Sequence, residues 1–260
     1  MNSLSNSYGF FNLKGGCGKT MLNYMLSASL SERGYKILCV DLDGQHNLSK
    51  AFLNKTPEKS LSNVLDGECT VNDVIVQPYP ESEKLKNIYL LPCNYDLFFF
   101  VEDGQPNKVL KFKKVMEQLS MEYSFIFVDT NPSISLVTTS ALLYCSNVIG
   151  VLDASLDSIE GFQFLEKKII NEIQKEANKD LKIFGIIQNN HDRRTNFTQA
   201  MMETTEKLYK KYLFKTIISP SSINKESRAA RVPLVEYDPK HPSSIQFSDL
   251  AGEFLRRVGV

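Results

Sequence analysis

A short glycine-rich segment carries the strongest chemical signal in this chain. It reads K-G-G-C-G-K-T over residues 14–20 and lies between an apolar, strand-like run and a helix-like run. Glycines let a backbone wrap closely around phosphates with its N–H groups turned inward, and the following helix N-terminus favours negative charge. In such a loop Lys19 reaches the β- and γ-phosphates of a nucleotide, and the Thr20 hydroxyl binds Mg²⁺. The segment therefore predicts a phosphate-binding loop.

The loop departs from the common form G-x-x-x-x-G-K-[ST], because Leu13 stands where that form has glycine and Lys14 is an additional lysine. This deviant Walker A pattern resembles the ParA/MinD family of ATPases. The resemblance implies a homodimer with ATP between its subunits, in which Lys14 crosses to the partner's nucleotide and takes part in catalysis beside Lys19. The residues that it places around ATP are Lys14, Gly15, Gly16, Cys17, Gly18, Lys19, Thr20 and Met21.

Two of these positions differ from the family pattern. The family usually has a small aliphatic residue at the position of Cys17 and a second hydroxyl residue at that of Met21. A thiol near a helix N-terminus has two interpretations: an oxidisable group with a lowered pKa, or a small side chain that fits.

Carboxylates follow two further apolar runs. Asp41 and Asp43 belong to a segment, D-L-D-G-Q-H-N, that resembles the family's D-x-D-P-Q-x-N switch. The resemblance implies that Asp43 orients the attacking water and that Asp41 supports the Mg²⁺ shell. Gly44 replaces the family's proline, which predicts a looser loop. From the residues alone, two aspartates at a strand end also suit a capping role for the next helix.

A second carboxylate lies at the end of the apolar run S-F-I-F-V-D, residues 124–129. A buried strand of this kind delivers Asp129 to the carboxyl edge of a sheet, where it can hold Mg²⁺ through water. The run is the Walker B candidate, although Asn131 replaces the first proline of the family's D-x-P-P. Thr20, Asp41 and Asp129 are thus the predicted metal-site residues.

Strand-like and helix-like runs alternate along the chain. Runs without internal polar alternation, separated by helices, indicate a parallel sheet covered on both faces. The fold class predicted is α/β, with one doubly wound, mostly parallel sheet of the P-loop NTPase type, and residues 1–260 form a single domain. Strands are expected at 7–13, 36–40, 87–91, 124–129, 148–152, 183–188 and 215–218, and helices at 21–30, 106–119, 159–173, 196–212 and 248–258.

The family resemblance extends along most of the chain. The R-T-N tripeptide at 194–196 and the segment V-P-L-V-E-Y-D-P-K at 232–240 resemble the Soj/ParA branch, which partitions chromosomes or plasmids. By family geometry, Asn190 and Pro220 are expected near the adenine, although a surface amide and an ordinary loop proline explain these residues as well.

Charge is unevenly distributed in a chain whose 30 basic and 30 acidic residues cancel. A zero net charge argues against a surface that coats nucleic acid throughout. Residues 41–106 nevertheless carry a net charge of −6, and residues 207–231, with seven basic residues and one acidic, carry +6. The predicted contacts to nonspecific DNA are Lys225, Arg228, Arg231 and Arg256, although the family's I-P-R-N arginine is absent and a solvated lysine-rich face is the alternative.

The resemblance implies an Mg²⁺-dependent ATPase for DNA segregation, in the cytoplasm on the nucleoid, that a ParB-like centromere-binding protein stimulates. The alternative is a MinD-like ATPase that positions proteins at a membrane through a basic amphipathic last helix. No apolar run is long enough for a membrane span, and residues 1–8 lack signal-peptide features. Five cysteines without C-x-x-C spacing indicate reduced thiols, and none between Cys93 and Cys145 is placed to hold a metal cluster.

Overall fold

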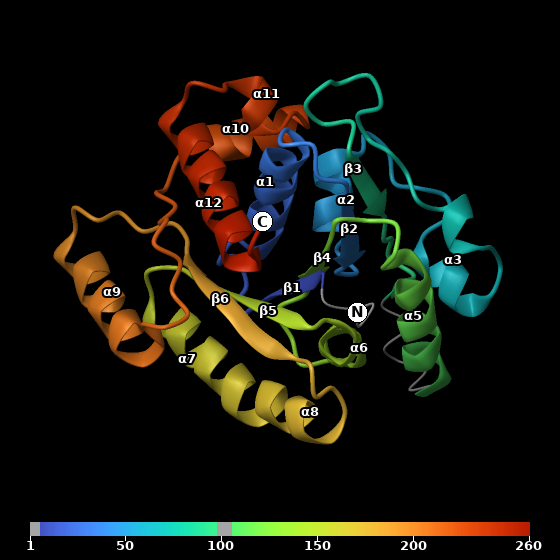
Figure 1. Ribbon diagram of the computed structural model, residues 1–260, viewed down its shortest axis with the longest axis horizontal. Helices are drawn as coiled ribbons and strands as arrows, with labels where there is room; N and C mark the ends of the chain where they lie inside the picture. The colour runs from blue at the N-terminus through green and yellow to red at the C-terminus, as the bar shows by residue number, and fades with distance from the viewer. Residues whose placement is uncertain (1–5, 98–105) are drawn as a thin grey trace.

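A six-stranded parallel sheet forms the centre of the molecule (Figure 1). The computed structural model describes residues 6–97 and 106–260, so residues 1–5 and part of the acidic segment 41–106 lie outside the described residues. The strands are β1 (Ser7–Phe11), β2 (Ile37–Leu42), β3 (Ile88–Leu91), β4 (Phe125–Thr130), β5 (Asn147–Leu152) and β6 (Lys182–Gln188). Their order is β3-β2-β4-β1-β5-β6, and all five neighbouring pairs are parallel. The doubly wound α/β prediction is therefore confirmed.

Helices cover both faces of the sheet (Figure 1). On one face lie α1 (Lys19–Ser31), α11 (Leu234–Tyr237) and α12 (Pro242–Val258), and on the other lie α5 (Pro106–Leu119), α6 (Leu136–Tyr144) and α7 (Leu156–Leu165). The remaining helices are α2 (Asn47–Phe52), α3 (Leu61–Asp66), η1 (Val71–Asp73), η2 (Glu166–Ile170), α8 (Asn171–Glu176), α9 (Asn196–Tyr209) and α10 (Ile223–Ala230). Within the described part of the chain, no helix is both long and apolar enough to cross a membrane.

The predicted elements differ from the structure chiefly at their ends. The segment predicted as one helix over 159–173 begins earlier, contains the π-helical turn η2 and continues through α8. The last helix begins at Pro242 rather than at residue 248, because proline suits a first helical turn and the His241 side chain caps it. The strand predicted at 215–218 was wrong: only isolated bridges, at Leu213 and Ile218, join this segment to the edge of β6.

The parallel topology of the sheet determines where the candidate site lies. In a parallel sheet all carboxyl ends of the strands meet at one edge. Asp41 and Asp129 are register partners on neighbouring strands, so the segments after β2 and β4 start side by side. The segments after β1, β5 and β6 leave the same edge. Five segments that are distant in sequence therefore converge there.

An aromatic cluster anchors α12 to the sheet. Phe254 is fully buried, and its ring lies 4.8–5.5 Å, centroid to centroid, from the rings of Tyr8, Phe125, Phe127 and Phe184. Edge-to-face aromatic pairs add to the stabilisation from apolar burial. The apolar face of the last helix is consequently part of the core.

This packing predicts a large cost for Phe254→Ala. Removing a buried ring leaves a cavity that the rigid sheet cannot close, so unfolding free energy should fall by about 3–5 kcal/mol. Urea unfolding followed by circular dichroism measures the loss. Met121→Ala, at a side chain that is 82% exposed, is the control and should change stability by less than about 0.5 kcal/mol. A loss below about 1 kcal/mol for Phe254→Ala would contradict the proposed packing.

Candidate nucleotide site

A cavity of about 440 Å³ opens at the carboxyl edge of the sheet. Its walls come from the glycine-rich loop, the segment after β2, the ends of β4 and β6, and helix α10. The lining residues are Gly15, Gly16, Gly18, Lys19, Thr20, Met21, Asp43, Gln45, Asn47, Thr130, Pro132, Asn189, Asn190, Ser221, Asn224, Lys225 and Arg228. The structure thus brings most of the predicted nucleotide-binding residues into one space.

The glycine-rich loop is held in a shape that only glycine permits at one position. Gly18 has φ of 102°, in the left-handed region, and a Cβ there would lie 2.0 Å from Nδ2 of Asn189. That same Nδ2 donates a hydrogen bond to the carbonyl of Cys17 at 2.8 Å. The residue that follows β6 therefore fixes the loop at Cys17 and Gly18, where it also lines the cavity.

Lys19 is buried at the base of the loop with its charge turned toward backbone oxygens. Its side chain is 6% exposed, and Nζ donates to the carbonyls of Asn12 at 2.9 Å and Lys14 at 3.3 Å. Neutral carbonyls satisfy its donors but do not neutralise its charge. An anionic group in the adjoining cavity would do so, because hydrogen bonds between charged partners are about twice as strong as neutral ones.

Asp129 lies beneath Thr20 and is fully buried. Thr20 Oγ1 donates to Asp129 Oδ2 at 2.7 Å, whereas the second carboxylate oxygen, Oδ1, has no partner among the described residues. Burial, with the nearby charge of Asp41, raises the pKa of Asp129 to about 8. An orphaned buried carboxylate oxygen beside a hydroxyl is a donor set that suits a hard divalent cation. The residues present therefore fit Mg²⁺.

Asp41 is also buried, but its carboxylate is occupied by its own segment. Oδ2 accepts from the backbone N and the hydroxyl of Ser49 at 2.8 and 2.7 Å, and Oδ1 accepts from the backbone N of Asp43 at 3.1 Å. Burial raises the pKa of Asp41 to about 6. Asp41 does not line the cavity. These contacts agree with the expectation that Asp41 caps the next helix, α2. The role of Asp41 in supporting the Mg²⁺ shell stays a prediction.

Asp43 lines the cavity at the start of the switch-like loop. Its carboxylate is turned back on that loop, accepting from the backbone N of Gln45 at 3.0 Å and weakly from Nδ2 of Asn47 at 3.4 Å. Three residues further on, His46 has a left-handed backbone with φ of 45°. A non-glycine residue in that region stores strain, which is typical of segments that change conformation at functional sites.

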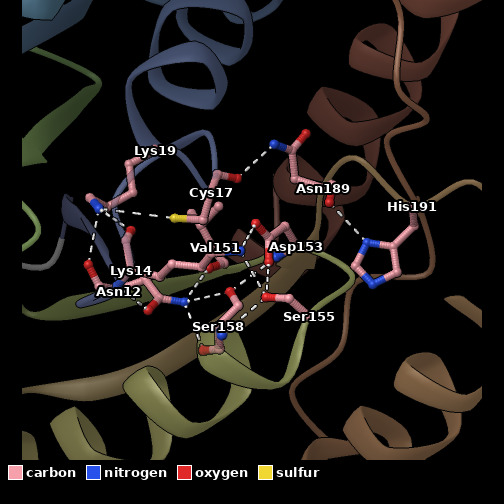
Figure 2. A network of polar contacts seen from close by, with 10 residues as sticks. All are labelled: Asn12, Lys14, Cys17, Lys19, Val151, Asp153, Ser155, Ser158, Asn189 and His191. Atoms are coloured by element: carbon pink, nitrogen blue, oxygen red, sulfur yellow. Dashed lines mark hydrogen bonds and ion pairs between the residues drawn. The ribbon is translucent and has the colours of Figure 1, made fainter. Parts of the chain in front are cut away.

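Lys14 is held by a residue of its own chain. Its Nζ forms an ion pair with Oδ2 of Asp153 at 2.7 Å and donates to Oγ of Ser155 at 2.8 Å, as Figure 2 shows. Ser155 in turn donates to Asp153 and caps α7. Lys14 does not line the cavity. In this conformation the Lys14 side chain is therefore directed to the carboxyl end of β5 and not into the cavity.

Cys17 belongs to the loop, but its side chain is buried and does not line the cavity. Burial raises the pKa of its thiol, so the interpretation as a thiol with a lowered pKa was wrong and the side chain acts as a small buried residue. Met21 lies in the cavity wall, and its contact with the nucleotide stays a prediction. Near the expected base position, Asn190 lines the cavity, whereas Pro220 is exposed and its neighbour Ser221 takes the lining place.

The predicted DNA-binding residues fall into two groups. Lys225 and Arg228 line the nucleotide cavity from α10, and Arg231 follows at the end of that helix. Arg256 is exposed in the last turn of α12, about 20 Å along the helix from Pro242 by the rise per residue. Its end of α12 lies away from α10 (Figure 1). The structure therefore does not bring Arg256 together with the other three.

Sequence reasoning missed several residues that complete the site. Asn12 and Asp153 each follow the carboxyl end of a strand and hold a lysine of the loop. A polar residue directly after a buried parallel strand is the signal that points to both. Asn224 carries no comparable signal, because it lies in the first turn of α10 and does not follow a strand.

The buried carboxylate predicts a pH dependence for metal-free protein. Because the pKa of Asp129 is raised on folding, the folded state holds this proton more tightly than the unfolded chain, and stability is lost as pH rises through about 8. Asp129→Asn cannot ionise. Its unfolding free energy should therefore rise relative to the parent protein by roughly 1–3 kcal/mol between pH 6 and 9.

Chemical unfolding in the presence of EDTA measures this difference. The exposed Asp249→Asn is the matched control and should show no such trend. A difference for Asp129→Asn that stays constant or shrinks as pH rises would contradict the assignment of a protonated, buried carboxyl group.

Comparison with known proteins identifies the family to which the chain belongs. A family model described as an AAA domain matches residues 7–183, which is more than half of the chain. The sporulation initiation inhibitor protein Soj of Bacillus subtilis is 27% identical over 246 residues, covering 93% of this chain and 95% of Soj.

Two solved structures share the fold. A putative plasmid partition protein of Borrelia burgdorferi bound to AMPPNP has a TM-score of 0.80 at 21% identity, covering 97% of this chain and 99% of that one. The septum site-determining protein MinD of Pyrococcus horikoshii with Mg-ADP has a TM-score of 0.78 at 24% identity, covering 98% and 97%. By the family match, the chain belongs to the AAA domain proteins and is a member of their ParA/MinD type of partition ATPase.

Proposed function

We propose that this protein is an ATP-dependent DNA partition ATPase whose ATP-bound dimer binds DNA nonspecifically. The observation that carries the proposal is the convergence on one cavity of Lys19, Thr20 and Asp43, with Asp129 hydrogen-bonded to Thr20 beneath the wall. These residues supply the positive charge, the metal-binding oxygens and the carboxylate that phosphoryl transfer to water requires. The similarity to Soj and to a plasmid partition protein supports DNA as the cargo.

Mg²⁺, when bound, would supply positive charge that stabilises the negative charge developing during phosphoryl transfer. In this chain Thr20 and Asp129 are the residues to hold it, since one buried oxygen of Asp129 has no hydrogen-bond partner within the described part of the chain. Asp41, buried directly beside Asp129 in the sheet, keeps the local charge negative. Asp43 is the residue to orient the attacking water once its carboxylate leaves Gln45.

Lys14 acts, in this proposal, on the nucleotide of the partner subunit. The ion pair with Asp153 then defines the resting position from which the lysine must leave. A phosphate oxygen can replace the carboxylate as partner, because both are anionic acceptors for a charged donor. The exchange makes dimer formation dependent on bound ATP. A ParB-like centromere-binding protein would stimulate hydrolysis and return the dimer to monomers in the cytoplasm, off the nucleoid.

A membrane-positioning role of the MinD kind is the second candidate, and the packing of α12 disfavours it. Insertion into lipid needs an accessible apolar face on the last helix. Here Phe247, Leu250 and Phe254 are buried in the core beneath that helix. Pelleting with anionic liposomes in the presence of ATP separates the two roles, since the partition proposal expects the protein to stay in the supernatant.

Lys19→Ala should abolish nucleotide binding. The substitution removes the buried ammonium group at the base of the loop, and a lost charged partner inside a binding site costs about 2–5 kcal/mol, or roughly 30-fold or more in affinity. Titration with a fluorescent ATP analogue and Mg²⁺ measures it. Lys182→Ala, an exposed lysine at the opposite edge of the sheet, is the control. Normal affinity in Lys19→Ala would reject this site.

Asp43→Ala should bind ATP but hydrolyse it at least about 100-fold more slowly, because the group that positions water is missing. The trapped ATP dimer should then remain on DNA after the parent protein has dissociated. Phosphate release and DNA co-sedimentation measure the two effects together. If Asp43→Ala hydrolyses ATP at the parent rate, Asp43 does not position the water.

A further inference from the structure

His46 is an unusual residue at its position in the switch-like loop. Its backbone is left-handed, with φ of 45° and ψ of 44°, and the residue is only 1% exposed. A side chain with a Cβ has a steric cost in that region, although histidine enters it more often than most residues. His46 directly precedes α2, yet its side chain makes no capping hydrogen bond to that helix within the described residues. Capping of α2 therefore does not explain why this ring is held here.

The ring of Tyr95 packs against the ring of His46. The two rings meet edge to face, with centroids 4.4 Å apart and planes at 87°. This arrangement stabilises aromatic pairs beyond the burial of their surfaces. Tyr95 lies in the segment after β3 and is 54% exposed, so much of its ring lies outside the core. We call the contact between these two rings the His46–Tyr95 latch.

The tyrosine side of the latch is fixed to α2. The backbone N of Cys93, two residues before Tyr95, donates to Oγ of Ser49 on α2 at 3.0 Å. The next residue of that helix, Lys50, has its Nζ 5.6 Å from the centroid of the Tyr95 ring, which is a cation–π distance. The same Nζ donates to the carbonyl of Gln45 at 3.1 Å. Tyr95 is thus a stationary partner for the loop that precedes α2.

The latch adjoins the residue that the proposed hydrolysis requires. Asp43 Oδ1 accepts from the backbone N of Gln45 at 3.0 Å, and Oδ2 accepts from Nδ2 of Asn47 at 3.4 Å. His46 lies between these two donors in the sequence, and its own backbone N donates to the carbonyl of Asp43 at 2.6 Å. The left-handed turn at His46 therefore sets where both donors lie. While the turn persists, the Asp43 carboxylate stays bound to its own loop.

We propose that His46 and Tyr95 are positioning residues for Asp43. The closed latch holds the Asp43 carboxylate on the loop, and the open latch releases it to orient the attacking water. The inference rests on the proposed role of Asp43 in ATP hydrolysis. Opening relieves the steric cost of the left-handed backbone at His46, whereas the contact between the rings opposes opening. The basal rate of hydrolysis depends on the balance of these two effects.

Tyr95→Ala removes one ring of the latch and leaves the loop sequence intact. The open state then becomes more populated, and kcat for ATP hydrolysis should rise about twofold to tenfold, the effect of losing one edge-to-face pair. KM for ATP should stay unchanged, since neither His46 nor Tyr95 lines the nucleotide cavity. Tyr95→Phe keeps the ring and should restore the parent kcat. Phosphate release over a range of ATP concentrations, with Mg²⁺, measures both constants.

His46→Asn removes the other ring. Asparagine also tolerates a left-handed backbone, so the loop can fold as it does in the parent protein. We expect the same rise in kcat as for Tyr95→Ala. The double variant should be no faster than either single variant, because both substitutions remove one shared contact. Rate increases that multiply in the double variant would overturn the latch.

The remaining variants connect the latch to Asp43. Adding Asp43→Ala to Tyr95→Ala should abolish the acceleration, and an acceleration that persists would overturn the proposal. Phe197→Ala is the matched control and should leave kcat unchanged, because this ring on α9 is 58% exposed and does not line the cavity.

Failure of the latch and failure of the proposed role of Asp43 give different results. Unchanged or slower hydrolysis in both Tyr95→Ala and His46→Asn, together with slow hydrolysis in Asp43→Ala, would overturn the latch alone. If Asp43→Ala hydrolyses ATP at the parent rate, the proposed role of Asp43 fails and the latch fails with it.

Discussion

Asp129 is fully buried at the carboxyl end of β4, and only one of its two oxygens has a hydrogen-bond partner among the described residues. A buried carboxylate in this state destabilises the fold unless a proton or a cation joins it. Asp41 lies beside it in register, which adds negative charge, and Lys19 is buried nearby with its ammonium group against two backbone carbonyls and the Cys17 sulfur. The apolar sheet thus holds unbalanced charge at one edge. Phosphates and a divalent cation together supply the missing charges, and the surrounding segments are arranged around that requirement.

Two cations farther from Asp129 also have partners that a phosphate group could replace. Lys14 is paired with Asp153 of its own chain, and Arg228 is held by a backbone carbonyl of the switch-like segment. Each of these cations has a partner in this conformation, yet each partner can be exchanged for a phosphate oxygen. In the proposed function, exchange of these partners would couple one bound nucleotide to two further events, assembly with a second copy and contact with DNA. The zero net charge is compatible with such coupling, because residues 207–231 concentrate a net charge of +6.

Much of this arrangement could be predicted from the sequence, because apolar runs and glycines act locally. The six strands of the sheet and the loop at residues 14–20 follow from such patterns. The start of α12 depends on a proline and a histidine cap, which the apolar pattern does not reveal. The burial that raises the pKa of Cys17 and the pairing of Lys14 with Asp153 depend on tertiary contacts between distant segments. The backbone carbonyls that accept from Lys50, Arg228 and Arg231 cannot be predicted from side-chain patterns either, since every residue has a carbonyl.

If a nucleotide at this edge of the sheet controls binding to DNA, the affinity for DNA must depend on which nucleotide is bound. The decisive experiment is a titration of the parent protein with one DNA duplex, performed with ATP and Mg²⁺, with ADP and Mg²⁺, and without nucleotide. We expect tight, salt-sensitive binding with ATP and weak binding in the other two states. Equal affinity in all three states would show that the nucleotide does not control binding to DNA.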